Sequence, residues 1–325
     1  AVMEISLRLV DTATGQVTAD FPGIPDLGFT NMSIAFNSAS KLFVNPKNAA
    51  THTVQGTLTP HSVATTKSAN GTFTTAGGTS AITGWNPTFS AALSTSISAS
   101  NPNLTLNLGN PLGTQELKSF DVNLPVGLVA NTTAVPRCTQ ANADAGNCAA
   151  GNLVGTVSTT FGSSDTVGED YTVAGTIYNV IPNADQPARL QAIVPVMVGP
   201  FDLGKLSIPV PTTLNSDLTV TASASLPSRY EGIAVRVRAM QMVIQGQPNA
   251  NKFMVAPTKC GASNITGTLT SDTSSSSTLS SAINITGCPT NFATSPAFSV
   301  TPDTTTRTTP VNLTFGLTSS ATNPT

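Results

Sequence analysis

Short runs in which apolar and polar residues alternate one by one are the dominant feature of this chain. They cover residues 3–9, 104–108, 218–222 and 233–238. A period of two places the apolar side chains on one face of a β-strand and the polar ones on the other. Turn-forming Gly and Pro fall between the runs, and no stretch carries the apolar stripe of an amphipathic helix. The pattern predicts an all-β protein.

The sequence also repeats itself over a long interval. Residues 41–46 (KLFVNP) and 56–59 (GTLT) reappear 211 residues later as KFMVAP and GTLT. Residues 87–89 and 103–105 have counterparts 209 residues later. Matches that keep one order and nearly one offset indicate an internal repeat.

The repeat predicts tandem immunoglobulin-like β-sandwich modules, because 325 residues exceed what one hydrophobic core usually organises. We expect a first module of type B over residues 1–85, a module of type A over 86–203 and a second B over 204–289. Residues 290–325 then resemble only the opening strands of a further A module, or a donor-strand tail.

The cysteines form two pairs that are local in the sequence and lack the C-x-x-C spacing of a zinc site. Residues 82–85 match 285–288, so Trp85 stands opposite one cysteine and Ala49 opposite another. Both sulfurs are therefore missing from the first copy together, which favours bonding within each local pair. The predicted disulfides, which imply an oxidising compartment, are Cys138–Cys148 and Cys260–Cys288.

Several segments resemble a repeat of large secreted surface proteins from actinobacteria and related bacteria. They are residues 120–131 (FDVNLPVGLVAN), 135–139 (VPRCT) with Cys148, 177–182 (IYNVIP) and 230–238 (YEGIAVRVR). The family consists of tandem-repeat proteins without an assigned active site, so the resemblance implies a location more than a mechanism. The chain departs from it at Ala149 and Ala150, where a proline is usual.

Candidate catalytic chemistry is sparse. His52 and His61 lie in a Thr-rich stretch, away from any motif of nucleophilic catalysis. The acidic run at 163–170 lacks the alternating spacing of a calcium loop. The sequence predicts no catalytic residue, no metal site and no cofactor. Isopeptide crosslinks are an open alternative, between Lys41, Lys118 or Lys252 and an Asn, beside Glu4, Glu116 or Glu231.

Charge and hydropathy exclude two classes of partner. The net charge is −2 and Lys and Arg form no run, so the counterion release that drives nucleic-acid binding is missing. No apolar stretch approaches the about 20 residues of a membrane helix. The start, which lacks a signal-peptide core, is interpreted as a mature N-terminus after export. Candidate N-glycosylation sequons begin at Asn31, Asn70, Asn103, Asn131, Asn264, Asn284 and Asn312.

These features predict a structural subunit of an extracellular, cell-surface fibre, pilus-like appendage or layer. Its partner would be a second copy, joined head to tail, with strand donation as one route. A cell-surface adhesin or carbohydrate-binding module that recognises surface glycans is the alternative, and a longer covalent tandem array is a competing account of the incomplete module. The strands expected to take part in assembly carry Ile5, Leu7, Leu9, Leu313, Phe315 and Leu317.

Overall fold

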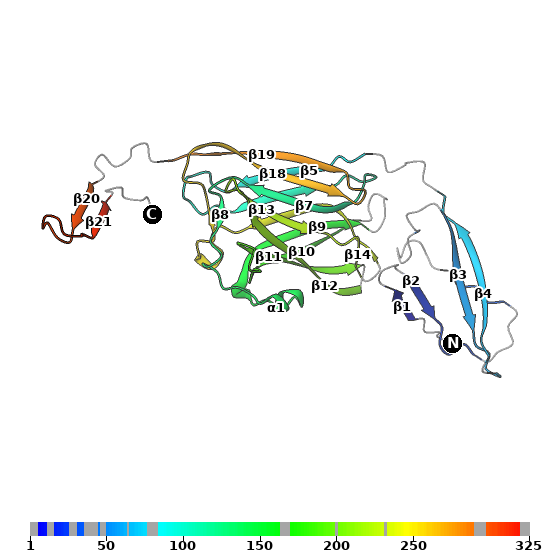
Figure 1. Cartoon of the computed structure of the whole chain (residues 1–325). Coiled ribbons are helices and arrows are strands. Elements are labelled where there is room, and N and C mark those ends of the chain that lie inside the picture. Colours follow the sequence, from blue (N-terminus) through cyan, green and yellow to red (C-terminus); the bar gives the residue numbers. More distant parts are fainter. Residues whose placement is uncertain are drawn as a thin grey trace.

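The computed structural model describes residues 6–11, 16–25, 31–35, 45, 50–63, 65–76, 84–162, 170–198, 201–230, 233–288 and 297–318. Strands account for nearly all of the regular structure, which confirms the all-β prediction. A central body built from β5 to β19 lies between hairpins at its two ends (Figure 1).

The central body is organised by one sheet of 11 antiparallel strands in the order β19-β18-β7-β13-β12-β11-β10-β9-β16-β6-β5. In chain order the strands are β5 (Thr88–Leu93), β6 (Leu104–Gly109), β7 (Leu117–Leu124), β9 (Leu153–Gly162), β10 (Asp170–Val180), β11 (Arg189–Val198), β12 (Phe201–Leu214), β13 (Val220–Ser225), β16 (Arg236–Ile244), β18 (Gly261–Ser271) and β19 (Ser276–Ile285).

The long strand β12 joins two layers of this sheet. It pairs with β11 as far as Pro211 and with β13 from Thr212 onward. One layer holds β11, β10, β9, β16, β6 and β5, and the other holds β13, β7, β18 and β19. The two layers enclose one apolar core, to which they contribute buried side chains such as Leu106 and Phe120, respectively. The two edge strands β5 and β19 lie against each other, so the sheet nearly closes on itself.

Short elements complete the central body. Cys138 and Cys148 enclose helix α1 (Gln140–Asp144), whose N-terminus is capped by the Thr139 hydroxyl accepting from the Asn142 N–H at 3.3 Å. The remaining small elements are η2 (Ala150–Asn152), η3 (Pro248–Ala250), the pair β8 (Val129–Ala130) with β17 (Met254–Val255), and the pair β14 (Arg229–Tyr230) with β15 (Ile233–Ala234).

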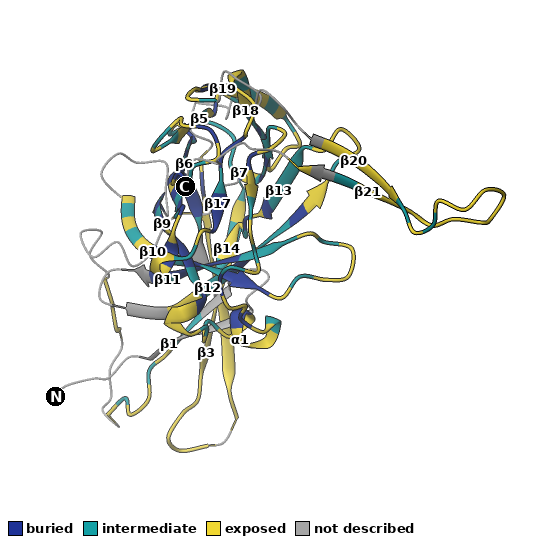
Figure 2. Cartoon of the chain, turned by 90° about the vertical axis from the view of Figure 1, so that its left-hand side faces the viewer, coloured by how far each residue is buried: buried dark blue, intermediate teal, exposed yellow. Residues whose placement is uncertain are grey.

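Among the described residues, three antiparallel hairpins lie outside the central body. They are β1 (Ser6–Asp11) with β2 (Gln16–Asp20), β3 (Thr51–Leu58) with β4 (Lys67–Thr74), and β20 (Ala297–Pro302) with β21 (Leu313–Thr318). Buried residues gather in the central body, whereas exposed residues run along β3 and the β20–β21 hairpin (Figure 2).

The structure differs from the predicted modules in one respect. The expected boundary near residue 204 falls inside β12, and residues 86–203 and 204–289 contribute strands to a single sheet. Strand β7 from the first segment lies between β13 and β18 from the second. The prediction of separate sandwiches on either side of residue 204 was therefore wrong, because long-range pairing interleaves their strands.

Candidate assembly surfaces

The C-terminal hairpin β20–β21 reproduces β5–β6. Both bounds of β20 lie 209 residues after those of β5, and the same offset relates β21 to β6. The pairing register is also shared, since Phe89 faces Leu108 in one hairpin and Phe298 faces Leu317 in the other. The internal repeat is therefore present in backbone structure as well as in sequence.

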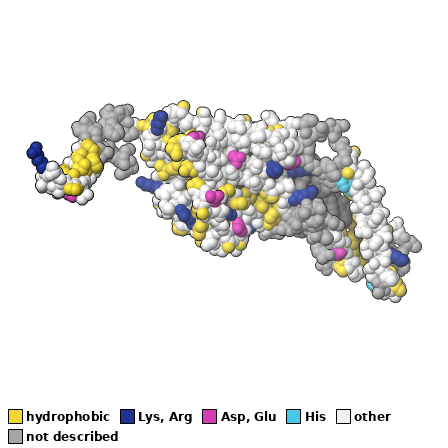
Figure 3. Space-filling model, in the orientation of Figure 1, with side chains coloured by type: hydrophobic (Ala, Val, Ile, Leu, Met, Phe, Trp, Pro, Cys, Tyr) yellow, Lys and Arg dark blue, Asp and Glu magenta, His cyan; other side chains and the backbone are white. Residues whose placement is uncertain are grey.

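These two hairpins differ sharply in burial. Ala91, Leu104 and Leu106 of β5–β6 are at most 7% exposed. Their counterparts in β20–β21, which are Val300, Leu313 and Phe315, are exposed by 45%, 50% and 64%, respectively. Figure 3 shows hydrophobic side chains gathered on this C-terminal hairpin. The same apolar face that fills the core in one copy is open to solvent in the other.

The hairpin β3–β4 corresponds in the same way to β18–β19. The first GTLT segment covers the end of β3 and the residue after it, and the second lies within β18. Gly56 pairs with Ala69 of β4 and Gly267 with Leu279 of β19, so the partners are 210 positions apart instead of 211. Ile265 and Leu269 of β18 are fully buried, at 0% exposure. Their counterparts Val54 and Leu58 are exposed by 59% and 53%.

In the central body these two kinds of hairpin meet. The Phe89 ring lies so close to Gly267 that a Cβ there would come within 2.7 Å of Phe89 Cγ. The hydroxyl of Ser281 on β19 donates to the carbonyl of Ala91 on β5 at 2.8 Å. Beyond the strands, Ile97 and Thr286 form an isolated bridge. The seam between β5 and the β18–β19 hairpin is therefore built around a ring seated on a glycine.

The outer edge of β5–β6 has a partner in the central body. Strand β6 pairs with β16 from Leu104↔Ile244 to Gly109↔Ala239. Within the described part of the chain, β21 pairs with β20 alone. Its remaining edge corresponds to the one that β6 offers to β16, and a strand edge of this kind is a template for pairing with another chain.

Two apolar residues near the N-terminus match two residues of β16 in sequence. Met32 and Ile34 precede Met242 and Ile244 by 210 residues. The two β16 residues are each 7% exposed, whereas Met32 and Ile34 are exposed by 41% and 37% in a segment without regular structure. The N-terminal region thus holds an exposed equivalent of the β18–β19 hairpin, and a two-residue sequence match to β16.

The predicted assembly residues are distributed unevenly. Leu7 and Leu9 belong to β1, which pairs with β2 and is not a lone strand. Ile5 lies outside the described residues. Leu313, Phe315 and Leu317 alternate along β21, which is paired with β20. Sequence reasoning missed β3 and β20 as parts of the surface, although the matching GTLT and P-x-F segments held the signal.

The cysteines pair as the sequence predicts. Cys138 bonds to Cys148 with Cα atoms 5.6 Å apart, and Cys260 bonds to Cys288 with Cα atoms 5.7 Å apart. Both separations are usual for disulfides. The second bridge joins the start of β18 to the chain just beyond β19, so it closes the open end of that hairpin.

All seven sequon asparagines are exposed, wherever they lie in the fold. Asn103 and Asn312 occupy equivalent places in the two matching hairpins. Asn103 accepts the Gly246 N–H through Oδ1 at 2.8 Å, and Asn312 donates through Nδ2 to Asp303 at 2.8 Å. Glycosylation at these positions stays a prediction.

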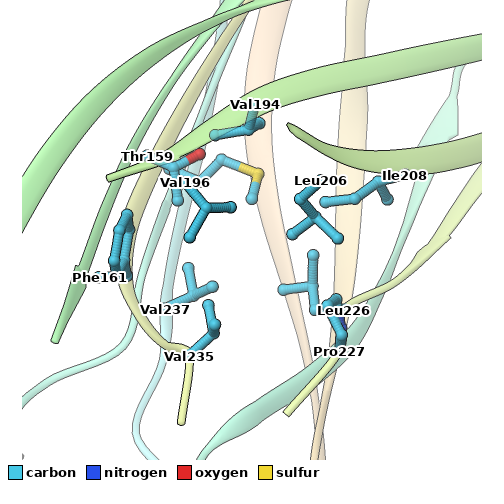
Figure 4. A pocket seen from close by; sticks show the side chains of 11 residues that line it. Thr159, Phe161, Val194, Val196, Leu206, Ile208, Leu226, Pro227, Val235 and Val237 are labelled. Atoms are coloured by element: carbon cyan, nitrogen blue, oxygen red, sulfur yellow. The ribbon is translucent and has the colours of Figure 1, made fainter. Parts of the chain in front are cut away.

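Two hollows of the central body differ in size and in the residues that line them. One, of about 20 Å³, is lined by apolar side chains of β9, β11, β12 and β16 and of the chain just after β13, together with Thr159 (Figure 4). That is little more than the about 10 to 15 Å³ needed for one water, far below a substrate pocket. An open hollow of about 410 Å³ lies beside Cys260 and includes Asn123, Thr219 and Lys259.

Metal-binding and isopeptide chemistry can be checked in the described residues. These hold no cluster of three or more His, Cys, Asp or Glu side chains able to bind a metal ion. Glu116 lies 3.6 Å from Arg236, a cation that the isopeptide hypothesis does not use. Lys118 and Lys252 are exposed, and Lys41, Glu4 and Glu231 lie outside the described residues.

The helices in the described part of the chain are short. None of them has the length and apolar character that crossing a bilayer requires. Comparison with known proteins gave no match to a family model, to a curated protein or to a solved structure.

Proposed function

We propose that this chain is a structural subunit of an extracellular surface fibre or layer, joined head to tail with further copies. The observation that carries the proposal is the pair of exposed hairpins, each equivalent to a hairpin that is buried against the other kind inside the central body. Each end of the molecule therefore presents half of a contact whose two halves are complementary.

Energetics favour association through these surfaces. Burying a large aliphatic or aromatic side chain contributes about 1.5 to 3 kcal/mol. Val54 and Leu58 at one end, and Phe298 and Phe315 at the other, are all more than half exposed. Because the two ends differ, the contact is heterologous, and such contacts build linear or helical polymers when they do not close into a ring.

The extracellular assignment rests on covalent chemistry and composition. All four cysteines are disulfide-bonded, and such bonds persist mainly in oxidising compartments. Only 9% of the residues are charged, against about 25% in average soluble proteins. A neutral surface rich in hydroxyl groups suits a stable structural layer.

Self-association of the oxidised chain tests the proposal directly. Light scattering after size-exclusion chromatography, over a range of protein concentrations, should give masses that grow with concentration, and negative-stain electron microscopy should show linear particles. A Phe298→Ser, Phe315→Ser double variant should stay monomeric, because both side chains are exposed in the free subunit. A wild-type chain that remains monomeric at the highest attainable concentration would contradict the proposal.

Carbohydrate binding is the alternative function. Its candidate surface is the open hollow beside Cys260, where Asn123, Thr219 and Lys259 supply amide, hydroxyl and ammonium groups. A glycan array separates the two proposals. One saturable ligand, together with an absence of polymerisation, would favour an adhesin over a structural subunit.

A further inference from the structure

We infer that the C-terminal hairpin β20–β21 of one copy docks on the N-terminal hairpin β3–β4 of a second copy, with Phe298 seated over Gly56. The contact repeats, between two chains, the seam in which Phe89 lies over Gly267. This inference rests on the proposed head-to-tail assembly and specifies the surface that forms it.

Both halves of the seat are open in the free subunit. Phe298 is 66% exposed. Among the described residues, a Cβ built on Gly56 would meet only the Ala69 carbonyl oxygen, at 3.8 Å, whereas at Gly267 the same space is filled by the Phe89 ring. Gly56 thus keeps the vacant shape that a phenylalanine occupies at the equivalent position of the central body.

The residues around the seat match as well. Val54 and Leu58 flank Gly56 on one face of β3, as Ile265 and Leu269 flank Gly267 on β18, since residues two apart share a face. On the other hairpin, Phe298 and Phe315 lie with their ring centroids 6.2 Å apart. Docking brings these two apolar faces together in the order already used inside the chain.

Val300 completes the apolar face of the C-terminal hairpin. It pairs with Phe315, as Ala91 pairs with Leu106 in the central body. In the central body Ala91, Leu106, Ile265 and Leu269 all belong to a single buried cluster. In the contact between two copies, one chain supplies the equivalents of Ala91 and Leu106, and the other chain supplies those of Ile265 and Leu269.

The partner must be a separate copy. The β20–β21 and β3–β4 hairpins lie at opposite ends of the central body (Figure 1). Docking between copies leaves one unused hairpin at each end of a dimer, so the same contact can add a third copy.

Cysteine trapping tests the predicted pairing. A chain carrying Phe298→Cys is mixed with a chain carrying Gly56→Cys under mild oxidation. A Cβ built on Gly267 would lie 2.7 Å from Phe89 Cγ, so the equivalent Cβ pair lies within reach of the about 3.5 to 4.5 Å of a disulfide. Non-reducing electrophoresis should show a heterodimer that disappears on reduction. Thr57→Cys, on the opposite face of β3, is the matched control and should give no such product.

A valine in place of Gly56 provides a second test of the docking contact. Gly56→Val leaves an exposed strand that accepts a β-branched residue, yet it occupies the space meant for Phe298. The dissociation constant of self-association should rise about tenfold or more. Thr57→Val, on the other face, should leave it unchanged.

The outcomes separate this inference from the proposed function. If the Gly56→Val variant polymerises at the same protein concentration as the wild type, and Gly56→Cys gives no crosslink above the Thr57→Cys control, the docking geometry is wrong. The proposal of a structural subunit would still stand. Absence of polymers in the wild-type chain would overturn both. A specific crosslink together with weakened association in Gly56→Val supports both.

Discussion

The hairpins β5–β6 and β20–β21 have the same length, the same register and the same alternating apolar face, yet one is a core element and the other is exposed. The hairpins β18–β19 and β3–β4 form a second pair that shares the apolar face but not the strand lengths, and whose register differs by one position. Since β5–β6 and β20–β21 have the same local structure, the difference between them lies in what covers each apolar face. Burial in this fold is therefore a property of the neighbours and not of the hairpin itself.

This contrast identifies which interactions hold the central body together. Three interactions join segments that are far apart in the sequence. They are the contact of the Phe89 ring with Gly267, the hydrogen bond from Ser281 to Ala91, and the pairing of β6 with β16. A hairpin removed from such partners keeps its backbone hydrogen bonds but loses its core. Two-stranded hairpins alone are at best marginally stable in water, so the terminal hairpins gain most from a partner.

The strongest expected contrast comes from one leucine in each of the matching strands. Leu269→Ala, at a fully buried position, should lower the free energy of unfolding by about 3 to 5 kcal/mol. Leu58→Ala, at the exposed counterpart, should change it by less than about 0.5 kcal/mol in the monomer. Urea denaturation measures both. Equal losses would contradict the view that neighbours decide burial.

The disulfides sharpen the comparison at the hairpin ends. Replacing Cys260 and Cys288 together by alanine should cost about 3 kcal/mol, because the unfolded chain regains the entropy of a closed loop. The first copy of the repeat has Trp85 and Ala49 at these places, so its hairpin has no such bond to lose. Thermal unfolding with and without reductant, with the Cys138, Cys148 double-alanine variant as a second arm, measures the effect. A reductant-insensitive melting temperature would contradict it.

A smaller effect is expected at the two glycines. Gly267→Ala places a methyl group against the Phe89 ring and should destabilise the fold by about 1 to 3 kcal/mol. Gly56→Ala meets open space in the monomer and should be neutral or slightly stabilising, by up to about 1 kcal/mol. Chemical denaturation of both variants checks the difference. A stable Gly267→Ala variant would mean that the ring moves aside freely.

The smallest contrast concerns pH. A hydrogen bond from the Thr219 hydroxyl lowers the pKa of Asp217, whereas the residue 211 positions earlier is the non-titrating Ser6. A carboxyl whose pKa is lowered by folding stabilises above its unfolded value and loses that contribution as the pH falls through the folded value. Asp217→Asn should therefore remove a slight stabilising contribution at neutral pH and flatten the acid side of the stability profile, with wild type and variant converging as the pH falls below the ordinary value of 3.8.

Denaturation midpoints of wild type and Asp217→Asn at neutral and acidic pH test this. Because Asp217 is fully exposed, the expected change is slight and should shrink in high salt. A larger effect of the substitution at acidic pH than at neutral pH would reverse the assigned sign.

Local patterns predicted much of this architecture. The alternating runs at 104–108 and 218–222 lie in or beside β6 and β13, and the long-range matches identified hairpins that the structure repeats at the same offsets. The cysteine pairs followed because each is local in sequence. These features share one property, since each depends on residues close together in the chain or on direct copying.

The sequence could not predict that the module boundary expected near residue 204 falls inside a strand, nor which strands pair with one another. Pro209 and Pro211 in β12 are typical of an interruption, yet the strand continues through both as it passes from β11 to β13. The insertion of β7 between β13 and β18 joins residues far apart, and no local pattern encodes it. Helix α1 was missed because its five residues are too few for an apolar period, although Thr139 provides a helix-capping residue.

The shared register of β5–β6 and β20–β21 also makes them competitors during folding. Both can approach β16 with the same alternation, which in repeat proteins is a route to misassembly. Synthesis favours the native choice, because β5–β6 leaves the ribosome well before β20–β21. Refolding of the whole chain removes this order. The choice of the hairpin that pairs with β16 then depends on side-chain volume. Phe315 is larger than the Leu106 it would replace, and Val300 larger than Ala91, so the wrong hairpin overfills a closely packed site.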